Sequence, residues 1–175
     1  MTAPHNRRAP CRPPPPRLPP QDIRRRFFLG VGVSVFVMRP KEGEKGPVLS
    51  LLEVWIMLIL KAANGRWVEA DKIMAIALLL EKIYGLTKAC FVPSRIPWSR
   101  DVDAALKRLA ELKLAEASPQ GGAYRLTEEG RVAVERYPPN DPRIRYPFSC
   151  IKFFADWSTD TLAEYIQVNY PDWKA

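Results

Sequence analysis

The amino-acid sequence predicts a mainly α-helical fold with a small antiparallel β wing, which places the chain in the α+β class. After Ser99, which can cap a helix, apolar residues recur at spacings of three and four: Val102, Ala105, Leu106, Leu109 and Leu112. The Gly-rich turn 118–122 then separates two short stretches, 114–118 and 123–126, that can pair as strands. Thr127 can cap a further helix, whose first turn is acidic. Helix, strand, turn, strand and helix in this order are typical of a winged helix-turn-helix.

The net charge is distributed unevenly along the sequence. Of 175 residues, 47% are apolar and 26% are charged, which is ordinary for a globular protein, and the formal net charge is +8. Residues 1–46 hold 10 Lys or Arg and 3 Asp or Glu, a charge of +7, whereas residues 47–175 hold 17 and 16, a charge of +1. The basic character therefore belongs to the N-terminal part, and it is no evidence that the folded part binds nucleic acid.

Residues that carry chemistry are few, and they argue against catalysis. The three cysteines, Cys11, Cys90 and Cys150, are odd in number and far apart, so neither a disulfide framework nor a metal site is indicated. The single histidine is His5, so no Ser–His or Cys–His pair can form in the body of the chain. We expect no enzyme activity, no cofactor and no metal ion. Few Asn and Gln together with 18 prolines are typical of a thermophile.

Residues 1–37 are expected to lie outside the folded domain. Their first twenty residues contain eight prolines and four arginines, a composition typical of a disordered tail. The apolar run 27–38 follows three arginines, as in a twin-arginine export signal, but no cleavage site follows it and it is too short to span a bilayer. The change of composition at Met38 favours a start of translation there. A later start, a disordered tail or extra strand, and an export signal are the three interpretations; we expect a cytoplasmic protein without a membrane segment.

The winged-helix domain is expected to cover residues 38–137 and to begin with an apolar helix. Ser50 and Glu53 fit a capping box for a helix over 51–63, which ends at Asn64-Gly65. This helix is apolar nearly all round, a pattern that indicates burial in the core or against a partner.

A second helix and an irregular segment follow. Residues 67–68 can form a short third strand, and the helix 71–84 ends at Gly85. About a dozen residues then precede Ser99, whereas a helix-turn-helix joins its two helices by three or four. We expect three side chains of this segment to pack on the body: Phe91, Ile96 and Trp98.

Residues 138–175 are expected to form a C-terminal aromatic extension. Residues 138–142 are rich in proline and predict a stiff linker. A short helix is indicated by Ile151, Phe153, Phe154 and Trp157, and the run Ser158-Thr159-Asp160 offers caps for another. So many aromatic side chains have to be covered, either by the body or by a second subunit.

Several motifs in this order resemble a known family: residues 65–69, 80–86, 96–102, 124–131 and 165–173. Over residues 50–173 the chain resembles the YwgA-type winged-helix proteins of archaea and bacteria, and at a greater distance the Panacea (SocA-type) antitoxin domain. Members of the family tend to have Gly-Pro-Tyr/Phe-Ser where this chain has Ile-Pro-Trp-Ser, and Tyr-Pro-Glu where it has Tyr-Pro-Asp. The resemblance implies a transcriptional regulator without a catalytic motif.

A DNA-binding regulator would place the helix after Ser99 in the major groove and the wing on phosphates of double-stranded DNA. The candidate residues are Arg100, Asp103, Ala104, Lys107 and Arg108 on the helix, Gln120, Gly121, Gly122 and Arg125 on the wing, and Arg131 behind it. The same helix face also fits a solvated surface with two ion pairs, Arg100/Asp103 and Lys107/Glu111.

The alternative function is a protein-interaction or dimerisation module that does not bind DNA. The near-neutral body and the aromatic C-terminus favour it, and the apolar helix 51–63 favours a homodimer. Surface charge discriminates the two: a basic stripe along the helix and wing would indicate DNA, whereas an apolar patch from the helix 51–63 and residues 150–173 would indicate a protein partner.

Overall fold

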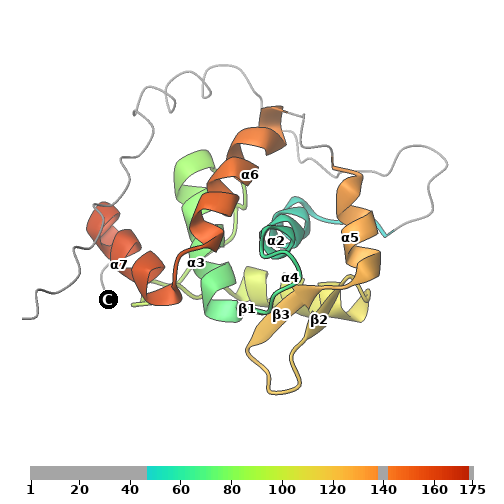
Figure 1. Cartoon of the computed structure of the whole chain (residues 1–175). Coiled ribbons are helices and arrows are strands. Elements are labelled where there is room, and N and C mark those ends of the chain that lie inside the picture. The colour runs from blue at the N-terminus through green and yellow to red at the C-terminus, as the bar shows by residue number, and fades with distance from the viewer. Residues whose placement is uncertain (1–46, 138–141, 174–175) are drawn as a thin grey trace, which may run out of the picture. The chain divides into compact units, whose positions relative to one another are not determined.

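The computed structural model describes residues 47–137 and 142–173, which form six α-helices, one 3-10 helix and three short strands (Figure 1). They are, in order, α2 (Leu51–Ala62), β1 (Val68–Glu69), α3 (Ala70–Tyr84), α4 (Arg100–Glu111), β2 (Ala115–Ala117), β3 (Ala123–Leu126), α5 (Glu128–Glu135), α6 (Pro142–Ala155), α7 (Thr159–Asn169) and η1 (Pro171–Trp173). The expected mainly helical α+β chain with a small antiparallel sheet is confirmed. The interpretation of residues 1–37 and residues 138–141 of the predicted linker 138–142 fall outside the described residues, whereas Pro142 begins α6.

The core is built around α2. Its capping box is present, because the Ser50 hydroxyl accepts from the Glu53 N–H while the Glu53 carboxylate accepts from the Ser50 N–H at 2.6 Å. Eight consecutive residues, 53–60, are buried, since α2 contacts α3, α4, α5, α6 and β3 (Figure 1). The apolar surface of α2 is therefore covered by its own chain, and it does not supply the homodimer interface expected from the sequence.

The strands form one antiparallel sheet in the order β1-β3-β2. Tyr124 of the central strand β3 pairs with Val68 of β1 on one side and with Ala117 of β2 on the other. The third strand is thus confirmed, one residue later than expected. The turn between β2 and β3 places Gly121 and Gly122 at φ 77° and 73°, a backbone region that favours glycine.

The first turn of α5 lies against the loop before β2. Thr127 caps α5 by accepting from the Gly130 N–H at 3.0 Å, and its own hydroxyl donates to the Lys113 carbonyl at 2.6 Å. A Cβ at Gly130 would lie 1.9 Å from the Leu114 carbonyl oxygen. The glycine in the Thr-Glu-Glu-Gly motif is therefore required by close packing of α5 on the backbone of Leu114.

The segment between α3 and α4 differs from expectation at one residue. Val92 and Trp98 form an antiparallel bridge, in which each N–H donates to the other carbonyl. The bridge buries Pro97 and Ser99 but turns Trp98 outward, and 49% of its surface is exposed. The prediction that Trp98 packs on the body was wrong, because alternate residues of an extended segment point to opposite sides. Phe91 and Ile96 are half-buried, and Phe91 packs against the core.

The C-terminal helices complete the core rather than standing apart from it. α6 packs on α2 and α3, and α7 packs on α3. Of the three cap residues expected over 158–160, the structure uses the first: the hydroxyl of Ser158 caps α7 by accepting from the Thr161 N–H. Phe154 is buried and its ring lies within 5.7 Å of three other aromatic rings, whereas Phe153 stays 43% exposed. Among the helices of residues 47–137 and 142–173, none combines the length and the apolar character needed to cross a bilayer.

Candidate nucleic-acid interface

α4 lies beside the sheet and presents one face to the core and one to solvent. The Ser99 hydroxyl accepts from the Val102 N–H at 3.4 Å and starts the helix. Four residues are buried on the core face: Val102, Ala105, Leu106 and Leu109. The predicted apolar face is confirmed, and the opposite side exposes Arg100, Ala104, Lys107 and Glu111.

The charges on the exposed face of α4 are partly neutralised within the helix. Lys107 donates to the Asp103 carboxylate at 2.8 Å, and this hydrogen bond raises the pKa of Lys107. The sequence had suggested the pairs Arg100/Asp103 and Lys107/Glu111, so Asp103 and Lys107 each pair with a different partner than expected. Within the described residues, Arg100 forms no ion pair, and it is exposed.

Arg108 is half exposed, but its guanidinium is already bound to groups of the fold. Its guanidinium donates to both oxygens of the buried Glu53 carboxylate, at 2.7 and 2.8 Å, and to the Val48 carbonyl at 3.2 Å. The side chain of Glu53 is only 3% exposed, so this ion pair is anchored in the core. Arg108 therefore joins α4 to the start of α2 and is committed to the fold.

Arg125 of the wing contacts two side chains, Glu116 and Trp67, that were not predicted from the sequence as its neighbours. Arg125 pairs across the strands with Glu116, to which its guanidinium donates, and its Cζ lies 4.5 Å from the ring centroid of Trp67. The register extends this row, because Val68 opposite Tyr124 places Trp67 beside Arg125. The alternation of residues in β1 and β3 is the sequence signal that relates the two side chains.

The wing tip is exposed to solvent, whereas Arg131 lies beside a pocket. Gln120, Gly121 and Gly122 are exposed at the tip, where the Ser118 hydroxyl donates to the Gly121 carbonyl at 2.8 Å. Arg131 lies 3.7 Å from Glu128 and, together with Arg125, lines a pocket of about 390 Å³ beside the end of α2. The structure thus brings Arg125 and Arg131 together at one pocket.

The α4 and wing surface as a whole carries little net charge. Residues 99–127 contain five cations (Arg100, Lys107, Arg108, Lys113 and Arg125) and four acids (Asp101, Asp103, Glu111 and Glu116), which gives 5 − 4 = +1. Of these acids, Asp101 accepts from the Cys90 N–H at 2.8 Å. A continuous basic stripe is therefore not present on this surface of the described residues.

Within the part of the chain that the structure describes, no three side chains of His, Cys, Asp or Glu lie close enough together to hold a metal ion. In comparisons with models of known protein families, with curated proteins and with solved structures, no match to this chain was found. The resemblance of its motifs to YwgA-type proteins therefore stays a prediction.

Proposed function

We propose that the chain is a winged helix-turn-helix protein that binds double-stranded DNA and regulates transcription. The order α2-β1-α3-α4-β2-β3 and the sheet order β1-β3-β2 support the winged-helix assignment. The observation that carries the proposal is the solvent face of α4, which exposes Arg100, Ala104 and Lys107 beside the β2–β3 hairpin. The motifs shared with YwgA-type regulators point in the same direction.

The exposed residues of α4 have distinct parts in this proposal. Arg100 has no carboxylate to release before it contacts a phosphate or a guanine edge. Lys107 exchanges Asp103 for a phosphate at little cost, because water and salt screen an exposed ion pair of this kind. Ala104 lies between them and is small enough for close approach of the helix to the groove.

The other sequence candidates are assigned less direct parts. Gln120, Gly121 and Gly122 at the wing tip would lie near the backbone of the duplex. Arg125 and Arg131 are paired with acids, so they would have to leave these acids before they could contact DNA. Arg108 is excluded as a DNA contact, because moving it away from Glu53 would leave a buried carboxylate without its cation.

The test is a titration of the full chain against duplex DNA from the upstream region of its own gene, across a salt series. Arg100→Gln combined with Lys107→Gln should weaken binding and lower the slope of log K against log salt by about two, one for each phosphate contact. Arg145→Gln combined with Lys152→Gln is the matched control, since both residues are exposed on α6. Every variant retains the basic residues 1–46, so any contribution of these residues to DNA binding is the same in all variants. Equal effects of the two double variants would refute binding through α4.

A second candidate function, a protein-interaction module, is favoured by one observation next to α4. Val92 and Trp98 pair in the bridge and are 54% and 49% exposed, so together they offer a two-residue apolar surface. Sedimentation equilibrium of the full chain tests whether this surface joins two copies. Trp98→Arg should convert a dimer to a monomer, whereas a dimer that Trp98→Arg leaves intact would rule out this interface.

A further inference from the structure

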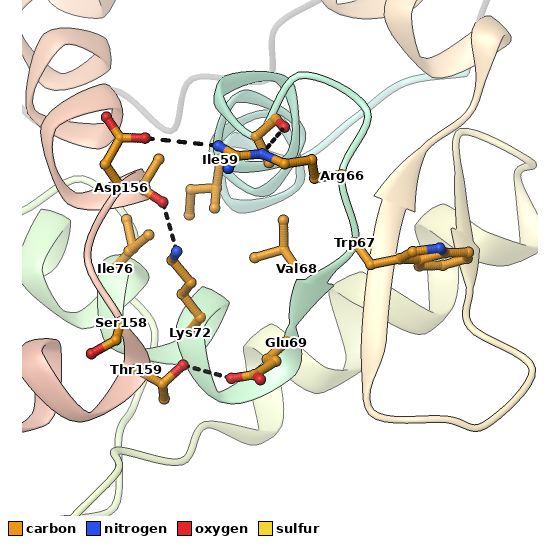
Figure 2. A pocket seen from close by; sticks show the side chains of 12 residues that line it. Ile59, Arg66, Trp67, Val68, Glu69, Lys72, Ile76, Asp156, Ser158 and Thr159 are labelled. Atoms are coloured by element: carbon orange, nitrogen blue, oxygen red, sulfur yellow. Dashed lines mark hydrogen bonds and ion pairs between the residues drawn. The ribbon is translucent and has the colours of Figure 1, made fainter.

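A pocket of about 290 Å³ lies on the side of the molecule where the C-terminal helices meet the start of α3 (Figure 2). Its walls come from the end of α2, from the strand β1 and the residues before it, from the first turns of α3, and from the turn between α6 and α7. The pocket thus brings together segments about 90 residues apart, as the hydrogen bond from Thr159 to Glu69 illustrates.

Lys72 projects into this pocket without a carboxylate partner. Its Nζ donates to the Ala155 carbonyl oxygen at 2.6 Å, and it forms no ion pair with any carboxylate of the described residues. An ammonium has three N–H donors, so two remain after this bond. Burial lowers the pKa of Lys72, and the neighbouring Arg66 lowers it further, while Asp156 and Glu69 act in the opposite direction.

Arg66 supplies a second cation with spare donors. Its Nε donates to the Ala63 carbonyl at 3.1 Å, and one terminal nitrogen lies 3.7 Å from Asp156, a distance too long for a strong hydrogen bond. Figure 2 shows its guanidinium at the rim of the pocket, facing Lys72 across the opening. The guanidinium has five N–H donors, so most of them are unused.

The two acids of the pocket offset these cations only in part, since Asp156 forms a long ion pair with Arg66 and neither acid forms an ion pair with Lys72. Glu69 accepts from the Thr159 hydroxyl at 2.6 Å and lies at the opposite end of the pocket from Arg66 (Figure 2). Asp156 is 81% exposed, so its charge is well solvated and screened by water. Three buried apolar side chains also line the pocket: Ile59, Val68 and Ile76.

We propose that this pocket binds a small organic carboxylate, whose carboxylate group accepts from Lys72 and Arg66 and whose hydrocarbon part lies on Ile59, Val68 and Ile76. Two cations with unused donors beside an apolar wall fit such a ligand, because each part of it finds a complementary surface. β1 pairs with β3 of the hairpin, so a ligand that lies on Val68 would contact the wing sheet. That it acts as an effector of DNA binding rests on the proposed function; that it binds does not.

Isothermal titration calorimetry of the full chain with benzoate tests the proposal, with benzamide as the neutral analogue and inorganic phosphate as the anion without a hydrocarbon part. We expect saturable binding of benzoate, with a dissociation constant of about 1 mM or tighter, and at least about tenfold weaker binding of the other two. Equal binding of benzamide, equal binding of phosphate, or no binding of benzoate up to about 10 mM would each overturn the proposal.

Two variants locate the site. Lys72→Met and Arg66→Gln should each weaken benzoate binding about tenfold, because each removes a charge-assisted hydrogen bond. Arg66 is largely exposed, so Arg66→Gln should fold normally even if loss of the Lys72 bond to Ala155 disturbs the turn. Lys152→Met and Arg145→Gln on α6 are the matched controls. Unchanged affinity in Arg66→Gln would place the anion elsewhere. Because calorimetry needs no DNA, failure of the regulator proposal and failure of the pocket proposal are distinguished.

Discussion

Arg108 on α4 donates from one guanidinium nitrogen to both carboxylate oxygens of Glu53 on α2, although the two residues are 55 positions apart. The same carboxylate closes the capping box of α2 with Ser50. One buried acid therefore satisfies the start of one helix and fixes the last turn of another.

Arg108→Ala should destabilise the fold by about 1–3 kcal/mol, because it leaves the buried Glu53 carboxylate without its charged donor. Lys107→Ala is the control, since its pair with Asp103 is exposed to solvent and should contribute far less to stability. Urea unfolding followed by circular dichroism measures both. Similar midpoints for the two variants would mean that the Glu53 pair does not stabilise the fold.

Gly130→Ala should cost about 3 kcal/mol, because the added methyl group would overlap the Leu114 carbonyl oxygen and force α5 away from the sheet. Gly121→Ala in the wing meets nothing within 4 Å, so it should cost only the strain of a positive φ, about 1–2 kcal/mol. Thermal unfolding compares the two variants. A larger loss for Gly121→Ala would contradict the packing of α5 described above.

Phe154→Ala should destabilise the chain by about 3–5 kcal/mol, since it opens a cavity where α6 meets α3 and α7. The neighbouring Phe153→Ala offers a matched comparison, because its ring is 43% exposed and the same atoms are removed. We expect its unfolding midpoint to shift far less. If the two shifts were equal, α6 would have to be rotated about its axis relative to this structure.

Cys150 should react with iodoacetamide much more slowly than the exposed Cys90, because the thiolate is the reacting form and burial raises the pKa of Cys150 to about 11. A hydrogen bond with Tyr84 acts weakly in the opposite direction. At pH 8 we expect a difference of about 100-fold or more, and the rate at Cys150 should keep rising with pH until about pH 11.

Peptide mass spectrometry of a Cys11→Ser background resolves the two sites. Equal rates at pH 8 would show that the packing of α6 on α3 opens readily in solution. A rate at Cys150 that levels off near pH 9 would show that its thiol is not held in a buried site.

The sequence by itself determined where most elements begin and end. Ser50, Ser99, Thr127 and Ser158 each cap a helix as expected, because a capping hydroxyl acts on N–H groups only two or three residues away. The β2–β3 hairpin follows from its Gly-rich turn for the same reason. These signals are local, so they can be interpreted without knowing what the helices pack against.

Only the tertiary structure decided what the charged and aromatic side chains do. Arg108 could equally have faced solvent, since nothing near it in the sequence identifies Glu53 as its partner. Trp98 was expected inside and lies outside, and Lys72 meets Ala155 from 83 positions away. The physical reason is that a long side chain is stabilised by the groups that the packing of distant helices brings within hydrogen-bond reach. That packing is driven by hydrophobic burial, which is not directional and therefore does not identify these partners in advance.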